Sequence, residues 1–226
     1  PGPPHGNGHY LKSTRGLYSR ASRKVMSILS EKADKFEQAS IDEAYLDVTD
    51  YCGGDWDKAL ALARHLQISV KEELGLSTSF GIGSTRIIAK MGSEENKPSG
   101  IHRTLPDEIE SFFEDRPVRE VPGIGPKTAT RLAEWGINTM SEVSEYGEIA
   151  LARFTSERFA SWIIRVQEGE TSDDVSPLRS RKSIGKETTF EYDQTDTEKV
   201  LIHLSNLVAK VIKRAKEINV AGRLGE

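Results

Sequence analysis

Apolar residues recur at helical spacing near the start of the chain. This stripe consists of Leu17, Ala21, Val25 and Leu29. It predicts an amphipathic helix over roughly 14–33. The next segment, Lys35–Asp50, is too polar for a core helix and is consistent with a strand, a turn and a second strand.

A second helical stripe runs from Asp55 to about Glu73. It consists of Ala59, Ala63, Leu66 and Val70. Asp55 can accept hydrogen bonds from the first turn, and Gly75 is a suitable stop. Ser77–Gly83 is short, apolar and bounded by glycine, so we expect a buried strand there, followed by a helix over about 85–93.

After Ser99-Gly100 the pattern changes to short helices joined by tight turns. We expect these helices at about 106–115, 126–135, 140–146 and 156–168. The polar stretch Gly169–Pro177 is typical of a linker. Lys182–Tyr192 is rich in Thr and Phe and predicts a strand, and the stripe after it predicts a long helix. That stripe comprises Val200, Leu204, Leu207, Val211 and Ala215. One strand and one helix cannot close a core, so we expect the C-terminal domain to be cut short.

The charges are unevenly distributed along the chain. The formal net charge is −4, which argues against indiscriminate binding to nucleic acid. Residues 1–24 hold five Lys/Arg and no acid, and residues 179–226 hold ten Lys/Arg against seven Asp/Glu, so the middle carries −12. Basic ends around an acidic centre suit a protein that grips polyanions and holds cations, although solvated faces that merely differ in charge explain the pattern equally well.

The remaining composition indicates an intracellular protein. Cys52 is the single cysteine and cannot pair within the chain, which agrees with a reducing, cytoplasmic setting. Apolar runs such as Leu60–Ala63 are too short to span a membrane. Pro1–Gly8 is rich in Pro, Gly and His, so we expect an unstructured leader and no signal peptide.

Two adjacent carboxylates, Asp42 and Glu43, lie in the expected strand–turn–strand segment. Neighbouring strand residues face opposite sides, so both can reach one ion only near a turn. Hard divalent cations bind carboxylate oxygens together with substrate phosphates. Most such pairs are solvated turn residues, but Ile41 and Ala44-Tyr45-Leu46 are expected to be buried around this one. A carboxylate pair in that setting is costly without a cation, which favours a metal site.

The segment Ser40–Asp47, Ser-Ile-Asp-Glu-Ala-Tyr-Leu-Asp, closely resembles the palm signature of the Y-family translesion DNA polymerases, in the DNA polymerase IV (DinB) branch. The resemblance implies that Asp42 ligates metal and that Glu43 completes the catalytic acidic cluster. It implies two magnesium ions in the intact enzyme. Asp47 belongs to the motif, but we assign it a structural role.

The segment Gly81–Gly100 carries a second match to this family. A lysine is a compact charge suited to a triphosphate, although without further context Lys97 is more simply explained as one of many exposed lysines. The resemblance implies that Lys97, in Lys-Pro-Ser-Gly, contacts the phosphates of the incoming nucleotide. The sequence departs from the family at Thr85-Arg86, where Asn-Lys is usual, so any role that needs the Asn is in doubt.

Val121–Thr128 resembles the helix-hairpin-helix of the same polymerases' thumb. Its glycines allow backbone N–H groups to converge at a helix start, which makes a phosphate site that reads no bases; the alternative is a plain turn between packed helices. The candidate DNA-binding residues are Gly123, Ile124, Gly125, Lys127 and Thr128. A second, weaker hairpin at 154–164 lacks the glycines.

Arg181–Phe190 resembles the first strand of the family's little-finger domain, in which basic side chains follow the template backbone. The candidates are Arg179, Arg181, Lys182 and Lys186. A cluster of this kind suits phosphate contacts. On composition alone, an edge strand protected by lysines is equally plausible.

The resemblance runs from about Tyr10 to Glu226 and implies an α+β fold. This fold has a palm with a mixed sheet lacking its first strand, a small all-α helix-hairpin-helix thumb, and the start of an α+β little finger. The expected boundaries are 1–13 for a leader or fingers remnant, 14–103 for the palm, 104–172 for the thumb, 173–179 for a linker and 180–226 for the partial little finger.

The family motif with another metal-binding Asp, an aromatic steric gate and the fingers contacts is missing before Asp42. We therefore expect this chain alone to lack activity. The implied function is error-prone DNA synthesis in DNA repair, with primer–template DNA and deoxynucleoside triphosphates as partners. A sliding clamp could bind through a tail absent here, and we expect a monomer. The alternatives are a non-catalytic helix-hairpin-helix DNA-binding module and a nucleotide cyclase on a similar palm.

Overall fold

The computed structural model describes residues 14–171, 174–176 and 183–220. It divides the chain into two compact units, Pro1–Pro177 and Leu178–Glu226. The strands of the first unit are β1 (Lys35–Gln38), β2 (Ala44–Asp47), β3 (Phe80–Ile82) and β4 (Ile101–Arg103). Its α-helices are α1 (Arg15–Ser30), α2 (Thr49–Cys52), α3 (Trp56–Leu74), α4 (Arg86–Glu95), α5 (Ile109–Phe113), α6 (Pro126–Glu134), α7 (Met140–Ala152) and α8 (Glu157–Gln167). Short 3-10 helices, η1 (Pro106–Glu108) and η2 (Val118–Glu120), complete it.

The strands of this α+β unit form two two-stranded sheets within the described residues. β1 and β2 are antiparallel, and β3 and β4 are parallel. The hairpin register pairs Phe36 with Leu46 and Glu37 with Tyr45. Because side chains alternate along a strand, these two pairs face opposite sides of the hairpin. Phe36 and Leu46 pack on the core beside α1 and α3, which leaves Glu37 and Tyr45 for the other face.

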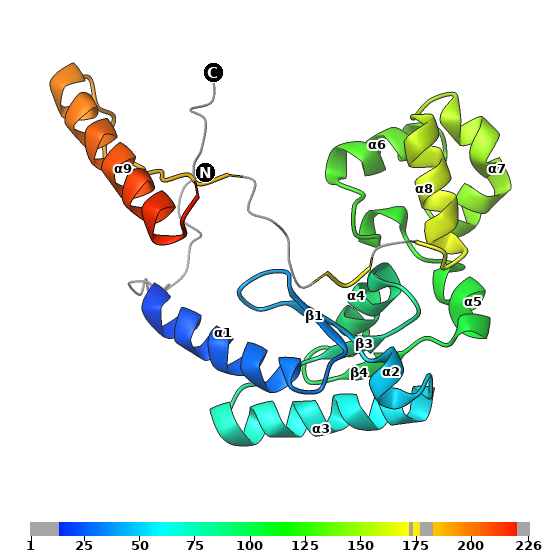
Figure 1. Cartoon of the computed structure of the whole chain (residues 1–226). Coiled ribbons are helices and arrows are strands. Elements are labelled where there is room, and N and C mark those ends of the chain that lie inside the picture. The colour runs from blue at the N-terminus through cyan, green and yellow to red at the C-terminus, as the bar shows by residue number, and fades with distance from the viewer. Residues whose placement is uncertain (1–13, 172–173, 177–182, 221–226) are drawn as a thin grey trace, which may run out of the picture. The chain divides into compact units, whose positions relative to one another are not determined.

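The two long helices α1 and α3 lie side by side along the strands (Figure 1). Their core includes Leu29, Leu62 and Leu66. The sequence prediction for α3 is confirmed at both ends. Asp55 accepts hydrogen bonds from the N–H groups of Asp57 and Lys58, and Gly75 takes a left-handed conformation at the C-terminus.

Helix α4 packs directly against β3 because two glycines leave room for it. A Cβ on Gly81 would lie 1.8 Å from the carbonyl oxygen of Ala89, and one on Gly83 would lie 2.4 Å from the Ile88 side chain. No side chain fits at such distances. The strand expected at Ser77–Gly83 is therefore confirmed as β3, although its residues are half-buried rather than fully buried.

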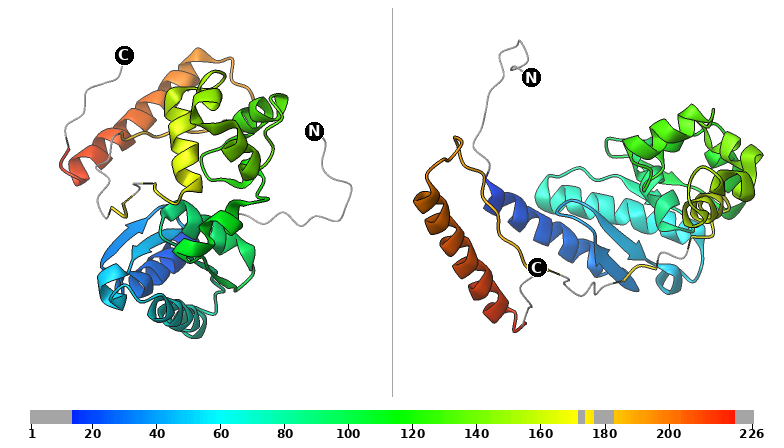
Figure 2. Two further views of the ribbon diagram at one scale, coloured as in Figure 1. Left: turned by 90° about the vertical axis from the view of Figure 1, so that its right-hand side faces the viewer. Right: turned by 90° about the horizontal axis from the view of Figure 1, so that it is seen from above.

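A second hydrophobic core joins α4 to the helices that follow it. It contains Ile87, Ile88 and Met91 of α4 together with Phe113 of α5 and Ile163 of α8. Further views show α6, α7 and α8 gathered in a group apart from α1 and α3 (Figure 2). Helix α4 thus contributes side chains to the core of this second group while it also covers β3 and β4.

The short helices lie where the sequence predicted them, with one extension. The helix expected at 140–146 is followed by a further helical segment that ends at Ala152. The two segments are separated by a kink at Gly147, whose φ of +71° is not helical. Thr139 and Glu142 form the capping box at its start. The strand β4 was not foreseen from the sequence.

The second unit contains α9 (Thr197–Glu217), capped by Asp196, in agreement with the predicted long helix. The strand predicted at Lys182–Tyr192 is wrong for its described part, since residues 183–192 form no strand. A strand-like composition needs a neighbouring strand to supply hydrogen bonds, and none lies beside this stretch in the described chain. Among the described helices, none is long and apolar enough to cross a membrane.

Candidate active site

The acidic pair lies in the turn between β1 and β2. The turn closes because the N–H groups of Ala39 and Ser40 both donate to the carbonyl oxygen of Glu43, at 3.0 and 3.1 Å. The hydroxyl of Ser40 accepts from the N–H groups of Asp42 and Glu43, at 3.2 and 3.1 Å. The same hydroxyl donates to the Asp42 carboxylate at 2.6 Å. Ser40 therefore fixes both the backbone of the pair and the side chain of its first member.

The predicted apolar surroundings of this pair are wrong. Asp42 and Glu43 are exposed, and Ile41 beside them is 51% exposed. The reason is that the turn projects beyond the strands, so only the residues from Ala44 onward reach partly buried positions. Desolvation is therefore not what makes this pair require a cation. What the turn offers a cation is two carboxylates on adjacent, exposed residues.

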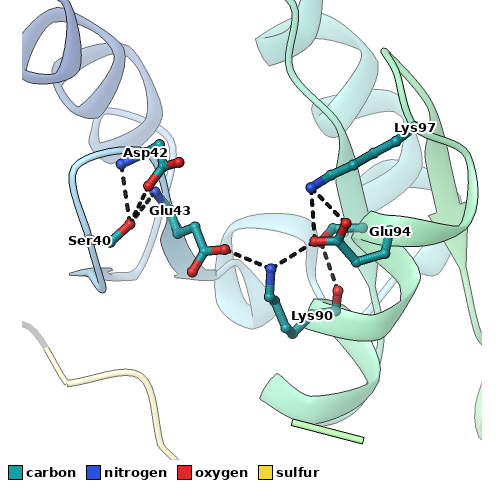
Figure 3. Close-up of polar contacts among 7 residues, drawn as sticks. Ser40, Asp42, Glu43, Lys90, Glu94 and Lys97 are labelled. Atoms are coloured by element: carbon teal, nitrogen blue, oxygen red, sulfur yellow. Dashed lines mark hydrogen bonds and ion pairs between the residues drawn. The ribbon is translucent and has the colours of Figure 1, made fainter. Parts of the chain in front are cut away.

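A chain of ion pairs runs from Glu43 to Lys97 through helix α4 (Figure 3). The ammonium of Lys90 lies 2.6 Å from Glu43 Oε1 and 2.8 Å from Glu94 Oε1. Lys97 lies 2.7 Å from the other oxygen of Glu94. The Asp42 carboxylate faces Ser40, whereas the Glu43 side chain reaches toward Lys90. Lys97 and Glu43 thus belong to one polar network, joined through Glu94 and Lys90.

The charges in this network reinforce one another. Burial alone would lower the pKa of Lys90, but the hydrogen bonds with Glu43 and Glu94 outweigh it and raise the pKa overall. The hydrogen bond from Lys90, followed by that from Lys97, lowers the pKa of Glu94. Both lysines therefore meet a carboxylate that stays ionised at neutral pH. Glu94 lies in the last turn of α4, where the helix dipole disfavours an acid, and the two lysines offset that cost.

Asp47, the last acid of the motif, stabilises local structure. It accepts hydrogen bonds from the N–H and the hydroxyl of Thr49, at 3.1 and 2.7 Å, and pairs with Lys35 at 3.3 Å. The hydrogen bond from the Thr49 hydroxyl is the main cause that lowers the pKa of Asp47. These contacts agree with the structural role that we assign to it.

Arg86, which stands where the polymerase family usually has Lys, has a structural role. Its guanidinium forms two hydrogen bonds to the Glu37 carboxylate, at 2.9 and 3.2 Å, and lies 4.1 Å from the centre of the Tyr45 ring. The Glu37 side chain is only 6% exposed. The N–H of Ser176 also donates to Glu37, at 3.0 Å. A lysine could not form this planar two-bond contact or stack in the same way. Thr85 caps α4 through the N–H of Ile88.

The residues present fit a divalent cation in donor type, although not as a complete site. Asp42 and Glu43 supply hard oxygen ligands on neighbouring residues at an exposed turn. Within the part of the chain that the structure describes, no group of three His, Cys, Asp or Glu side chains could hold a metal ion. The pair therefore needs further oxygen ligands, which phosphates can supply.

The loop before α6 presents backbone donors at a helix start. In the described part of the chain, the N–H groups of Gly123, Gly125 and Lys127 have no backbone acceptor. Gly123 has φ of +103° and lies against the Trp162 ring, so a side chain there would be strained and crowded. Lys127 is exposed and Thr128 is half-buried.

Ile124 differs from the other residues of this loop. Its side chain is buried in the second core, and its N–H donates to the carbonyl oxygen of Val121 at 3.0 Å. Ile124 therefore packs in the core, and its N–H already has a backbone acceptor. Of the basic candidates near the linker, Arg179, Arg181 and Lys182 lie outside the described residues, and Lys186 is exposed.

Sequence reasoning missed Lys90, Glu94 and Glu37 as members of the site region. The pairs Lys90–Glu43 and Arg86–Glu37 are separated by 47 and 49 positions. The only signal in the sequence was the spacing of Arg86, Lys90 and Glu94 at every fourth position, which places them on one face of a helix.

Family models match three segments of the chain. The impB/mucB/samB family matches residues 5–94, the HHH motif of the IMS family matches 106–137, and the C-terminal domain of the impB/mucB/samB family matches 181–224.

Curated relatives carry the name DNA polymerase IV. A protein of Listeria monocytogenes is 35% identical over 217 residues, covering 96% of this chain and 60% of the relative. A protein of Methanoculleus marisnigri is 35% identical over 221 residues, covering 97% and 60%. The chain thus spans about 60% of the length of the curated relatives that it matches.

Solved structures of Y-family polymerases share the fold. The chimera Dbh-Dpo4(243-245)-Dbh has a TM-score of 0.83 at 30% identity, covering 90% of this chain and 59% of the chimera. An insertion ternary complex of Dbh DNA polymerase has a TM-score of 0.73 at 28% identity, covering 91% and 60%.

Proposed function

Because this chain belongs to the impB/mucB/samB family of Y-family DNA polymerases, we propose that it acts in template-directed, error-prone DNA synthesis past damaged bases. The reaction is attack of a primer 3′-hydroxyl on the α-phosphate of a deoxynucleoside triphosphate, with pyrophosphate leaving. The observation that carries the proposal is the polar network that joins the Asp42–Glu43 turn to Lys97.

Each part of the site has a separate task in this reaction. Asp42 and Glu43 hold divalent cations, for which we propose two magnesium ions, and Lys97 holds phosphates of the nucleotide. Bound cations supply charge stabilisation for the attacking and leaving oxygens. Catalysis then consists mainly of positioning and electrostatic stabilisation.

The loop before α6 supplies the contact to DNA. Its N–H groups at Gly123, Gly125 and Lys127 point to phosphate binding without base readout. We propose primer–template DNA as the partner there, with Lys186 and the basic residues 179–182 as further phosphate contacts. A monomeric state, a cytoplasmic location and a sliding clamp as an additional partner complete the proposal.

A chimera with a relative tests the function directly. The matched segment of the Listeria monocytogenes DNA polymerase IV is replaced by this chain, because the two align over 217 residues. We expect the folded chimera to extend a primer on a template in the presence of magnesium. A chimera that folds and binds primer–template DNA but never extends the primer would support the alternative of a non-catalytic DNA-binding module.

The 226-residue chain by itself is expected to give no template-dependent primer extension. The physical reason is that its described residues offer the acidic pair no third carboxylate. The measurement is a gel assay with magnesium and all four nucleotides, with the chimera as positive control. Extension by the chain alone, at a rate that rises with its concentration, would contradict this expectation.

Lys127 is expected to contribute to DNA affinity through phosphates alone. Lys127→Ala should weaken duplex binding by about three- to tenfold regardless of DNA sequence. It should also reduce the slope of log Kd against the logarithm of the salt concentration by about one. Fluorescence anisotropy at several salt concentrations measures both quantities. Lys58→Ala on α3 is the matched control, since Lys58 is also exposed. Equal losses for the two variants would show that only overall charge matters.

A further inference from the structure

Lys90 lies between two carboxylates that come from different elements. Glu43 belongs to the β-hairpin turn, whereas Glu94 lies one helical turn away on α4 itself. The two Nζ distances, 2.6 and 2.8 Å, are nearly equal, so the ammonium is shared (Figure 3). Lys90 is 26% exposed and is therefore partly shielded from water.

The two partners of Lys90 differ in what else they can bind. Glu43 is a candidate ligand for the divalent cation, and a cation on it would repel the ammonium at so short a distance. Glu94 is already bound by Lys97, which contacts both of its carboxylate oxygens, and it lies on the same helix as Lys90. The ammonium therefore has a second carboxylate within reach when it loses the first.

The charges of these residues support a change of partner for Lys90, from Glu43 to Glu94, when a cation binds. The ion pairs of Glu43 and Glu94 with Lys90 and Lys97 are neutral in sum, and Asp42, which bonds to Ser40 instead, brings the net charge of the five residues to −1. Lys90 thus neutralises the acidic pair in part while no divalent cation is bound. A cation at Glu43 would replace that neutralisation, and Glu94 would retain Lys90.

We propose that Lys90 is a positioning residue that competes with the divalent cation for Glu43, and that Glu94 holds the Lys90 ammonium when the cation binds. This inference rests on the proposed function, since it takes Asp42 and Glu43 as the cation site. It makes two predictions of opposite sign. Removing the charge of Lys90 strengthens cation binding. Removing the charge of Glu94 leaves Glu43 as the carboxylate partner of Lys90 and therefore weakens cation binding.

The experiment measures the binding of Mn²⁺, a spectroscopic probe for the magnesium site, to the 226-residue chain by electron paramagnetic resonance. Mg²⁺ competition gives the affinity for magnesium. We expect Lys90→Met to tighten Mn²⁺ binding by about fivefold, the size of one partly exposed ion pair. Glu94→Gln should weaken it by about two- to threefold, again within the range of a partly exposed pair. Lys90→Arg keeps the charge and should stay near the wild-type value.

The outcomes separate the inference from the proposed function. A double variant, Asp42→Asn with Glu43→Gln, should remove the Mn²⁺ site; if it binds as the wild type does, both the function and the inference are overturned. If the double variant loses binding but Lys90→Met and Glu94→Gln change affinity in the same direction or not at all, the inference alone is overturned. Circular dichroism melting curves check that each variant is folded. If Lys90 had a purely structural role, both Lys90→Met and Glu94→Gln would weaken Mn²⁺ binding.

Discussion

In the chimera with the Listeria monocytogenes relative, Asp42→Asn and Glu43→Gln are each expected to reduce kcat/KM for nucleotide incorporation by about a thousandfold, equivalent to roughly 4 kcal/mol of transition-state stabilisation. The amide keeps the size of the side chain but removes the negative charge that holds the cation. Because both residues are exposed and lie in a turn, the substitutions should change thermal stability little. Single-turnover extension of a labelled primer measures the effect.

Asp47→Asn is the matched control for these variants. It changes an acid of the same motif that bonds to Thr49 and Lys35 rather than to Lys90 or Ser40. We expect a modest loss of stability and near-normal incorporation. If Asp47→Asn were as damaging as Asp42→Asn, or if the Asp42 and Glu43 variants remained active, the assignment of the acidic pair would be wrong.

Arg86→Met is expected to lower the free energy of unfolding of the first unit by about 3–5 kcal/mol, because it leaves the buried Glu37 carboxylate without its guanidinium partner. Arg86→Lys keeps a positive charge but loses the paired hydrogen bonds and the contact with Tyr45, so we expect a smaller loss of about 1–2 kcal/mol. Urea titration followed by tryptophan fluorescence measures both, since Trp56, Trp135 and Trp162 all lie in the first unit.

The Glu37→Gln, Arg86→Met double variant provides the critical comparison. Removing both charges should cost less than Arg86→Met alone, since no buried carboxylate charge then remains without the guanidinium that faces it. A double variant whose loss equals the sum of the two single losses would show that Glu37 and Arg86 do not interact energetically.

Local sequence patterns predicted most helices and strands of the first unit because the residues that start, stabilise and end each element are close together in the sequence. The helix between Asp55 and Gly75 has its cap, its stripe and its stop within about twenty positions. The hairpin around Asp42 and Glu43 likewise followed from a short polar run. The strand predicted from Lys182 to Tyr192 was wrong in its described part because a strand depends on a partner that local composition cannot supply.

The candidate site was predictable only in part, for the same reason. The motif indicated Asp42, Glu43 and Lys97, but the exposure of the turn follows from where the strands end, not from its apolar neighbours. Nothing within Lys35–Gln38 indicated that Glu37 would be buried, since this depends on Arg86 approaching from α4. Contacts between distant positions determine which charges become partners.

Helix α4 has ten residues and contacts three different regions of the first unit. Its first residue anchors the buried Glu37, its apolar side packs with Phe113 and Ile163, and Lys90 and Glu94 face the acidic turn. Because these side chains share one helix, a rotation of α4 about its axis would move Arg86, Lys90 and Glu94 together. We therefore expect substitutions in the core shared by α4, α5 and α8 to shift the Lys90 ammonium relative to Glu43.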